Sequence, residues 1–219
     1  MINPNLCIVE GAEERRTIPY IINHYQPWGD NEAEYLAEIR VRDGIDNILQ
    51  TDYLQTEFDN EAIKRIGIII DANDSASNRY ASVRDCCLTH FPNLPEQIDP
   101  HGVIVTNQKG KRLGIWIMPD NSMQGMLETF LGRMVDDSNR GLWEFAQQCA
   151  EQAKNDHSAP YLENHTDKAK IHTFLSWQDE PGNSLGLAVQ KKIFKPDNPA
   201  ANPFVEWFLE LYELQAGAA

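Results

Sequence analysis

Three acidic residues stand at the ends of apolar segments that have the pattern of β-strands. They are Glu10, Asp71 and Asp120, which follow the runs LCIV, IGIII and GIWIMP. In an open parallel sheet, ligands bind beyond the carboxyl ends of the strands. If these strands are neighbours, the three carboxylates converge at one edge of the sheet. The pattern therefore predicts a polar site at that edge.

Carboxylates held close together repel one another, and burial raises the cost of each charge. A hard divalent cation is the usual compensation, and Mg²⁺ commonly takes one or two carboxylates together with water and substrate phosphate. We therefore predict a Mg²⁺ or Mn²⁺ site with Glu10, Asp71 and Asp120 as catalytic groups, and with the ligands Glu10, Asp71, Asn73, Asp74 and Asp120. On the residues alone an alternative stays open, in which these acids begin polar loops and Asp71 caps the next helix.

The elements that must position these acids alternate between strands and helices. Strands are predicted at Leu6–Glu10, Glu38–Arg42 and Ile66–Ile70, and helices after each of them, the later two at Gly44–Phe58 and Ser77–Phe91. Pro19 conflicts with the first helix and indicates a kink or a late start. This alternation predicts an α/β fold, in which helices cover both faces of a parallel sheet.

The pattern changes in the second half of the chain. A hairpin is predicted from Gly102–Thr106 and Arg112–Met118 across the turn NQKGK. Helices are predicted at Met123–Met134 after a cap at Asn121 or Ser122, at Asn139–Lys154, at Asp167–Trp177, and at Phe204–Leu214 after a cap at Asn202. The chain is thus expected to form an α/β core (1–120) and a helical extension (121–219) that packs on it as one structural unit.

Composition narrows the classes of function. Lys and Arg total 19 and Asp and Glu total 33, which gives a net charge of −14 and argues against a basic groove over the whole molecule. Nucleic acid stays possible, because metal ions held by carboxylates can meet phosphate. The chain shows neither an apolar run of about 20 residues nor a secretory signal, so we expect a cytoplasmic protein without membrane contact. Four cysteines without CxxC spacing argue against a zinc or disulfide framework.

Around the acids, the chain resembles the Toprim domain, which topoisomerases, bacterial primases, recombination-mediator proteins and overcoming-lysogenization-defect nucleases share. Val9–Gly11 reads VEG, and an apolar strand followed by DAND occurs some sixty residues later, at Asp71–Asp74. The family has a Glu after its first strand and an Asp-x-Asp after a later strand, which together bind Mg²⁺. The match is closer still to a bacterial family of small uncharacterised Toprim-related proteins, through VEG, GIIIDAN, GIWIMPDN, HTFLSWQDEPG and FVEWF.

The resemblance implies roles for individual residues. Glu10 matches the Toprim Glu, which acts as a metal ligand or as a general acid/base, and Asp71 matches the first Asp of the Asp-x-Asp. Asn73 stands where the second Asp is expected. Its amide oxygen can still coordinate Mg²⁺ but supplies one charge fewer, and Asp74 could compensate from the next position. This departure bears on catalysis rather than on the fold.

Four further residues are secondary candidates. Glu128 lies off the apolar face of its helix, so it is either an acid close to the site or a solvated surface residue. Lys168 and Lys170 could contact phosphate, although a solvated helix start is the simpler explanation of both. His172 could line the site, whereas its apolar neighbours have the helical spacing of core residues.

These observations predict Mg-dependent phosphoryl transfer or hydrolysis on nucleic acid, most simply by a nuclease of the Toprim type. Toprim parts of related systems work with an ATPase, so an ATPase is a candidate partner that could supply a basic surface. The alternative is a non-catalytic Toprim-like binding or regulatory module, which Asn73 and the net charge favour. A phosphatase-like enzyme with Asp71 as its nucleophile is a lesser alternative, because the usual DxDGT motif is absent.

Overall fold

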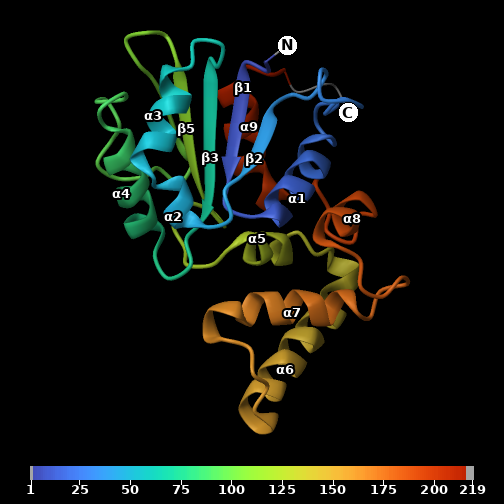
Figure 1. The fold of residues 1–219 in the computed structure, drawn as a ribbon. Coiled ribbons are helices and arrows are strands. Elements are labelled where there is room, and N and C mark those ends of the chain that lie inside the picture. Colours follow the sequence, from blue (N-terminus) through green and yellow to red (C-terminus); the bar gives the residue numbers. More distant parts are fainter. Residues whose placement is uncertain (1, 216–219) are drawn as a thin grey trace.

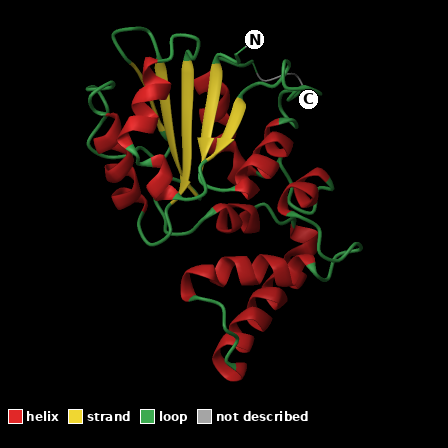
Figure 2. Cartoon of the chain, in the orientation of Figure 1, coloured by secondary structure: helices red, strands yellow, loops and turns green. Residues whose placement is uncertain are grey.

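The computed structural model describes residues 2–215, and its centre is a five-stranded sheet in the order β2-β1-β3-β5-β4 (Figures 1 and 2). The strands are β1 (Asn5–Val9), β2 (Glu38–Val41), β3 (Arg65–Asp71), β4 (Val103–Thr106) and β5 (Arg112–Met118). All neighbours pair in parallel except β4, which forms an antiparallel hairpin with β5. The predicted α/β fold and its hairpin are therefore confirmed.

Helices cover both faces of this sheet (Figure 1). On one face lie α2 (Ile45–Ile48), α3 (Thr51–Asp59) and α4 (Ala76–Cys87), over a core cluster that includes Ile68 and Ile70. On the other face lie α1 (Ala12–Ile22) and α9 (Asn202–Tyr212), over a cluster that includes Ile69 and Trp116. Strands buried on both faces are apolar throughout, which explains why IGIII and GIWIM show no alternation.

Four helices lie between β5 and α9. They are α5 (Leu127–Arg133), α6 (Arg140–His157), α7 (Thr166–Leu175) and α8 (Leu185–Gln190). In Figure 1, α5 lies beneath the carboxyl ends of the strands, and α6 and α7 pack together as a helical pair that extends away from the sheet. The α8 helix packs against α1. The chain then returns to the sheet through α9. The predicted helical extension therefore contains a helix that covers part of the sheet.

Two paired glycines bring α9 close to the sheet. Gly67 of β3 lies opposite Gly114 of β5. A Cβ atom on Gly67 would lie 2.6 Å from Tyr212 Oη, and one on Gly114 would lie 2.6 Å from Cδ2 of Leu211. The Tyr212 hydroxyl donates a hydrogen bond to the Leu6 carbonyl at 2.8 Å. The helix therefore packs directly on the strand backbone where these two side chains are missing.

Several helix boundaries differ from the predictions for local reasons. The helix predicted over Gly44–Phe58 is divided into α2 and α3, because Gln50 is extended with ψ 109°. The predicted late start at Pro19 is wrong, since α1 begins at Ala12 and runs through the proline. The α9 helix follows an Ala201 that is already helical, so its N-terminus has no side-chain cap from Asn202. The α8 helix was not predicted.

The start of α5 is the largest correction. The helix begins at Leu127, not after a cap at Asn121 or Ser122. Asn121 adopts a left-handed conformation with φ 64°, and its Oδ1 accepts the N–H of Ile117 at 2.7 Å. The side chain that was expected to cap a helix thus closes the turn after β5, and the helix starts several residues later.

Candidate functional site

Glu10 and Asp71 lie side by side at the carboxyl ends of neighbouring strands. Val9 pairs with Ile69 in the parallel register of β1 and β3, so Glu10 follows β1 beside the last residues of β3. Glu10 Oε2 accepts the backbone N–H of Asp71 at 3.3 Å. The structure therefore brings together the two acids on which the predicted site depends.

The Asp71 carboxylate faces other carboxylates. Its Oδ1 accepts the N–H of Leu127 at 3.0 Å, at the start of α5. Burial, and then the negative charges of Glu14, Glu128 and Glu10, raise the pKa of Asp71 well above its ordinary value. Four acidic side chains, Glu10, Glu14, Asp71 and Glu128, thus share one electrostatic environment, and we call them the acidic cluster.

Glu14 is the member of the acidic cluster that the sequence analysis missed. It lies on the first turn of α1, where it is 5% exposed, and its Oε2 accepts the N–H of Gly11 at 3.0 Å. Burial, and then the charges of Glu128 and Glu10, raise its pKa. The sequence signal is the glutamate half of a capping box, since Glu14 stands three residues after Gly11, the residue that precedes α1, and bonds back to its N–H.

Glu128 and Lys168 form an ion pair at the acidic cluster. Glu128 is 4% exposed, so its interpretation as a solvated surface residue is wrong. Its Oε1 lies 3.2 Å from Lys168 Nζ, which comes from the first turn of α7. Burial favours the neutral amine, but Glu128, followed by Asp71 and Glu14, raises the pKa of Lys168 above its ordinary value. The partly exposed ammonium group of Lys168 therefore neutralises only part of the negative charge of the four acids.

Lys170 and His172 do not share this position. Lys170 Nζ lies 2.7 Å from Glu151 Oε1, on the neighbouring helix α6. The His172 side chain is exposed, whereas Ile171 and Phe174 are buried in the core as predicted. Of the candidates on α7, Lys168 is the one that contacts the acidic cluster.

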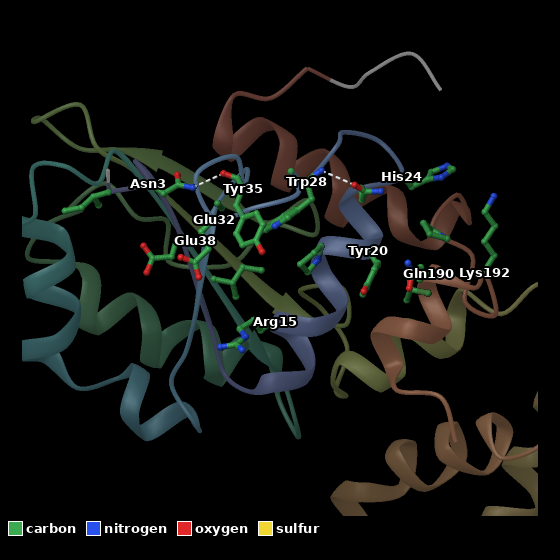
Figure 3. A pocket seen from close by; sticks show the side chains of 18 residues that line it. Asn3, Arg15, Tyr20, His24, Trp28, Glu32, Tyr35, Glu38, Gln190 and Lys192 are labelled. Atoms are coloured by element: carbon green, nitrogen blue, oxygen red, sulfur yellow. Dashed lines mark hydrogen bonds between the residues drawn. The ribbon is translucent and has the colours of Figure 1, made fainter. Parts of the chain in front are cut away.

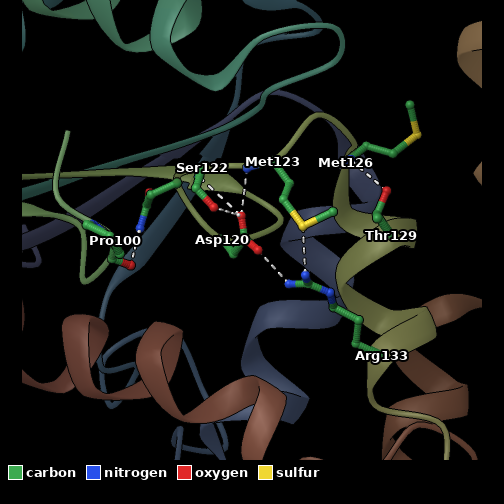
Figure 4. A network of polar contacts seen from close by, with 8 residues as sticks. Pro100, Asp120, Ser122, Met123, Met126, Thr129 and Arg133 are labelled. Atoms are coloured by element: carbon green, nitrogen blue, oxygen red, sulfur yellow. Dashed lines mark hydrogen bonds and ion pairs between the residues drawn. The ribbon is translucent and has the colours of Figure 1, made fainter. Parts of the chain in front are cut away.

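Asp120 is held in a turn after β5 (Figure 4). Its Oδ1 accepts the N–H and the hydroxyl of Ser122 at 3.1 and 2.9 Å and the N–H of Met123 at 2.8 Å. Its Oδ2 lies 2.7 Å from Arg133 Nη1. Burial alone would raise the pKa of Asp120, but the Met123 N–H and Arg133 lower it. Both oxygens are thus engaged by the turn and by α5, and this third predicted acid stabilises the loop that leads to Leu127.

The loop after β3 holds Asn73 by its backbone. Asn73 has φ 49°, and its N–H and C=O each bond to Gly125 at 2.8 Å, which ties this loop to the segment before α5. Asp74 is exposed. The side chain that caps α4 is Ser75, whose Oγ accepts the N–H of Asn78 at 3.2 Å. The interpretation of Asp71 as the cap of this helix is therefore wrong.

The acidic cluster offers the oxygen donors that a hard divalent cation prefers. Raised pKa values at Asp71 and Glu14 are the mark of carboxylates without enough compensating charge. Within residues 2–215, however, no group of three or more His, Cys, Asp or Glu side chains is arranged as ready ligands of one ion. The donor chemistry fits Mg²⁺ or Mn²⁺ bound by one or two carboxylates and completed by water.

A separate groove lies along the edge strand β2 (Figure 3). It has a volume of about 900 Å³ and is lined by α1, by the loop before β2 and by α8, with Trp28, Tyr35 and Lys192 among its side chains. No member of the acidic cluster lines it. The chemistry of the acidic cluster, not the size of this groove, therefore identifies the candidate site.

Comparison with known proteins gives one family. The profile of a family described as protein of unknown function (DUF3226) matches residues 4–213, nearly the whole chain. Neither a curated protein nor a solved structure matches. No helix in the described part of the chain is long and apolar enough to cross a membrane.

Proposed function

Because the chain belongs to the DUF3226 family, whose function is unknown, its activity must be inferred from its own residues, and we propose that it is a metal-dependent enzyme that cleaves or transfers phosphodiesters of nucleic acid. The observation on which this proposal rests is the convergence of Glu10, Asp71, Glu14 and Glu128 at adjacent strand ends, beside Lys168. The resemblance to the Toprim domain supports the same reaction class.

Glu10 and Asp71 are the groups that would hold the cation. Each has one oxygen engaged by a backbone N–H, which fixes the carboxylate and leaves the second oxygen to bind. Glu14, from the first turn of α1, would supply further negative charge near the cation. A bound Mg²⁺ or Mn²⁺ would polarise the phosphate and lower the pKa of a bound water.

The protein's own side chains contribute in two further ways. Lys168 is 44% exposed at its side chain and is positioned to stabilise negative charge that develops on a phosphate oxygen. Glu14, buried on the first turn of α1, would be the group that accepts a proton from an attacking water. Asp120 and Arg133 act indirectly by fixing the loop before α5.

The net charge of −14 makes tight binding of nucleic acid by this chain alone unfavourable. A partner with a basic surface would overcome this repulsion, and an ATPase is the candidate that the Toprim resemblance offers. The enzyme is therefore proposed to act on nucleic acid that a partner presents to it.

Calorimetric titration of Mn²⁺ into the metal-stripped protein tests the proposal. Glu10→Gln and Asp71→Asn should weaken binding by about tenfold or more, because each removes a charged ligand. Asp85→Asn is the matched control, since its side chain is 73% exposed on α4. Glu10→Gln should also abolish Mn²⁺-dependent cleavage of a labelled oligonucleotide. Cleavage that survives this substitution would contradict the mechanism.

The second candidate function is a non-catalytic binding or regulatory module. It is favoured by the lack of a ready three-ligand group in residues 2–215, and by Asn73 at the position of the second Asp. In that case the folded protein binds no Mn²⁺ but copurifies with an ATPase. Mn²⁺ binding that depends on Glu10 would contradict this alternative.

A further inference from the structure

Arg42 has no acidic partner, although acids outnumber basic residues in this chain by 33 to 19. Among residues 2–215, no carboxylate lies within ion-pair distance of its guanidinium, whereas twelve other Lys and Arg side chains have one. Its Nη2 reaches the Asn47 carbonyl at a long 3.4 Å, and its buried Nε has no hydrogen-bond partner. Because the Nε is buried, the donors of this arginine that stay open to a ligand are those of its Nη atoms.

Tyr53 holds the guanidinium in place. The Arg42 Cζ lies 3.6 Å from the centroid of the Tyr53 ring, a stacked cation–π contact. Stacking uses the face of the guanidinium and leaves its in-plane N–H groups to bind an acceptor. An arginine that is fixed in this way is prepared to bind an oxyanion. Carboxylate and phosphate both match its planar donors, and phosphate is the one that the proposed substrate supplies.

The sheet places Arg42 at the same edge as the acidic cluster. Val41 pairs with Val9, and the Arg42 N–H donates to the Val9 carbonyl at 3.1 Å. Two residues later, the N–H of Gly44 donates to the Glu10 carbonyl at 3.0 Å. Arg42 therefore follows β2 next to Glu10, yet it stays outside ion-pair distance of every acid in the described part of the chain.

We propose that Arg42, stacked on Tyr53, binds a phosphate that neighbours the reacting one along a polynucleotide. The inference rests on the proposed function, because the acidic cluster defines where the reacting phosphate lies. Since Arg42 lies beside the acids and not among them, it binds the next phosphate of the strand. The substrate is accordingly a chain of phosphodiesters, not a single nucleotide.

Fluorescence anisotropy with a labelled single-stranded oligonucleotide tests this inference, with Ca²⁺ in place of Mg²⁺ so that the measurement reports binding. The protein is titrated to high concentration, because its net charge of −14 makes binding by this chain alone weak. Arg42→Gln should raise Kd about tenfold, because a charge-assisted contact is lost. It should also reduce the slope of log K against log salt by about 0.7, the value for one phosphate on a single strand. Lys64→Gln is the matched control, because it removes the same charge from an exposed residue. Lys64 lies directly before β3, at the opposite end of the strands from the acidic cluster, and its substitution should leave Kd within twofold of wild type.

Arg42→Lys keeps the charge and guards against a folding defect. It should bind a few times more weakly than wild type, because an ammonium lacks the planar donors of arginine. If Arg42→Gln fails to fold, this variant decides, and wild-type affinity in it overturns the inference. Equal losses in Arg42→Gln and Lys64→Gln, or no binding by the wild-type protein, overturn it as well.

The two proposals fail in different ways. A protein that cleaves nucleic acid with an affinity indifferent to Arg42 overturns this inference alone. A protein that binds the oligonucleotide through Arg42, but neither binds Mn²⁺ nor cleaves, contradicts the proposed function and supports the phosphate contact.

Discussion

At the scale of single residues, the negative charge of the acidic cluster destabilises the metal-free protein, because its carboxylates are buried close to one another. Burial and neighbouring charges raise the pKa of Asp71 well above its ordinary value. An acid whose pKa is higher in the folded state binds more protons there than in the unfolded chain. The folded state is therefore favoured at low pH, and its stability falls as the pH rises from about 4 through the raised pKa of Asp71.

Asp71→Asn should accordingly stabilise the metal-free protein at pH 7. The amide keeps an oxygen for the Leu127 N–H and removes the charge. Each kcal/mol recovered raises Tm by about 2–4 °C in a chain of this size. The gain should shrink as the pH approaches 4, where the wild-type carboxyl is protonated. Thermal unfolding in EDTA across this pH range measures it, and a gain that does not change with pH would contradict the repulsion.

The Glu128–Lys168 pair gives a second prediction. Lys168→Met leaves a buried carboxylate without its cation and should cost about 2 kcal/mol in free energy of unfolding. Adding Glu128→Gln should recover most of that loss. Lys170→Met is the matched control and should cost less than about 1 kcal/mol, because its partner Glu151 is exposed. Urea unfolding of the set measures the coupling, and equal costs for the two lysines would contradict it.

The sequence predicted part of this cluster and missed the rest for physical reasons. Glu10 and Asp71 follow from local pattern, because strands that are apolar on both faces belong to a parallel sheet and end at one edge. The burial of Glu128 and the approach of Lys168 depend on how α7 packs against α5, and no local pattern sets that arrangement. Asp120 shows the reverse case, since its position was foreseeable but its partner Arg133 was not.

At the scale of elements, contact between α9 and the sheet depends on the two paired glycines. Gly67→Ala should cost about 1–3 kcal/mol, because the added methyl group collides with the Tyr212 hydroxyl, which is itself hydrogen-bonded. Gly141→Ala is the contrasting substitution. It lies in α6 with open space around it and should stabilise the protein by up to about 1 kcal/mol. Chemical unfolding of both variants measures these values, and a neutral Gly67→Ala would contradict the close packing.

Helix starts were the least predictable elements. Asn121 and Ser122 are residue types that commonly cap helices. Here, however, the Asn121 side chain accepts the N–H of Ile117, and Ser122 donates its N–H to Asp120 in the turn after β5. Competition of this kind between a turn and a cap is decided by tertiary contacts, whereas strand positions follow from runs of β-branched residues.

At the scale of the whole molecule, the α/β core is not complete without the C-terminal helices. One core cluster joins Ile69 and Trp116 of the sheet to Phe204 and Leu211 of α9. A fragment of residues 1–120 should therefore lack cooperative unfolding, because it leaves in water the part of the sheet that α9 covers, over β3, β4 and β5. Circular dichroism during thermal unfolding measures this, with the full chain as control. A fragment that unfolds cooperatively would show that the first 120 residues form a domain of their own.

Because α9 is the last element of the chain, the ribosome makes it well after the strands that it covers. A ribosome makes about 80 residues after β5 before it reaches α9, which takes roughly 4 to 16 s at 5–20 residues per second. Throughout that interval the strands have been made while α9 has not, and the strip along Gly67 and Gly114 offers exposed backbone as well as apolar surface. Until the last helix emerges and covers these strands, the nascent chain exposes apolar surface of the kind that makes unfinished proteins prone to aggregation.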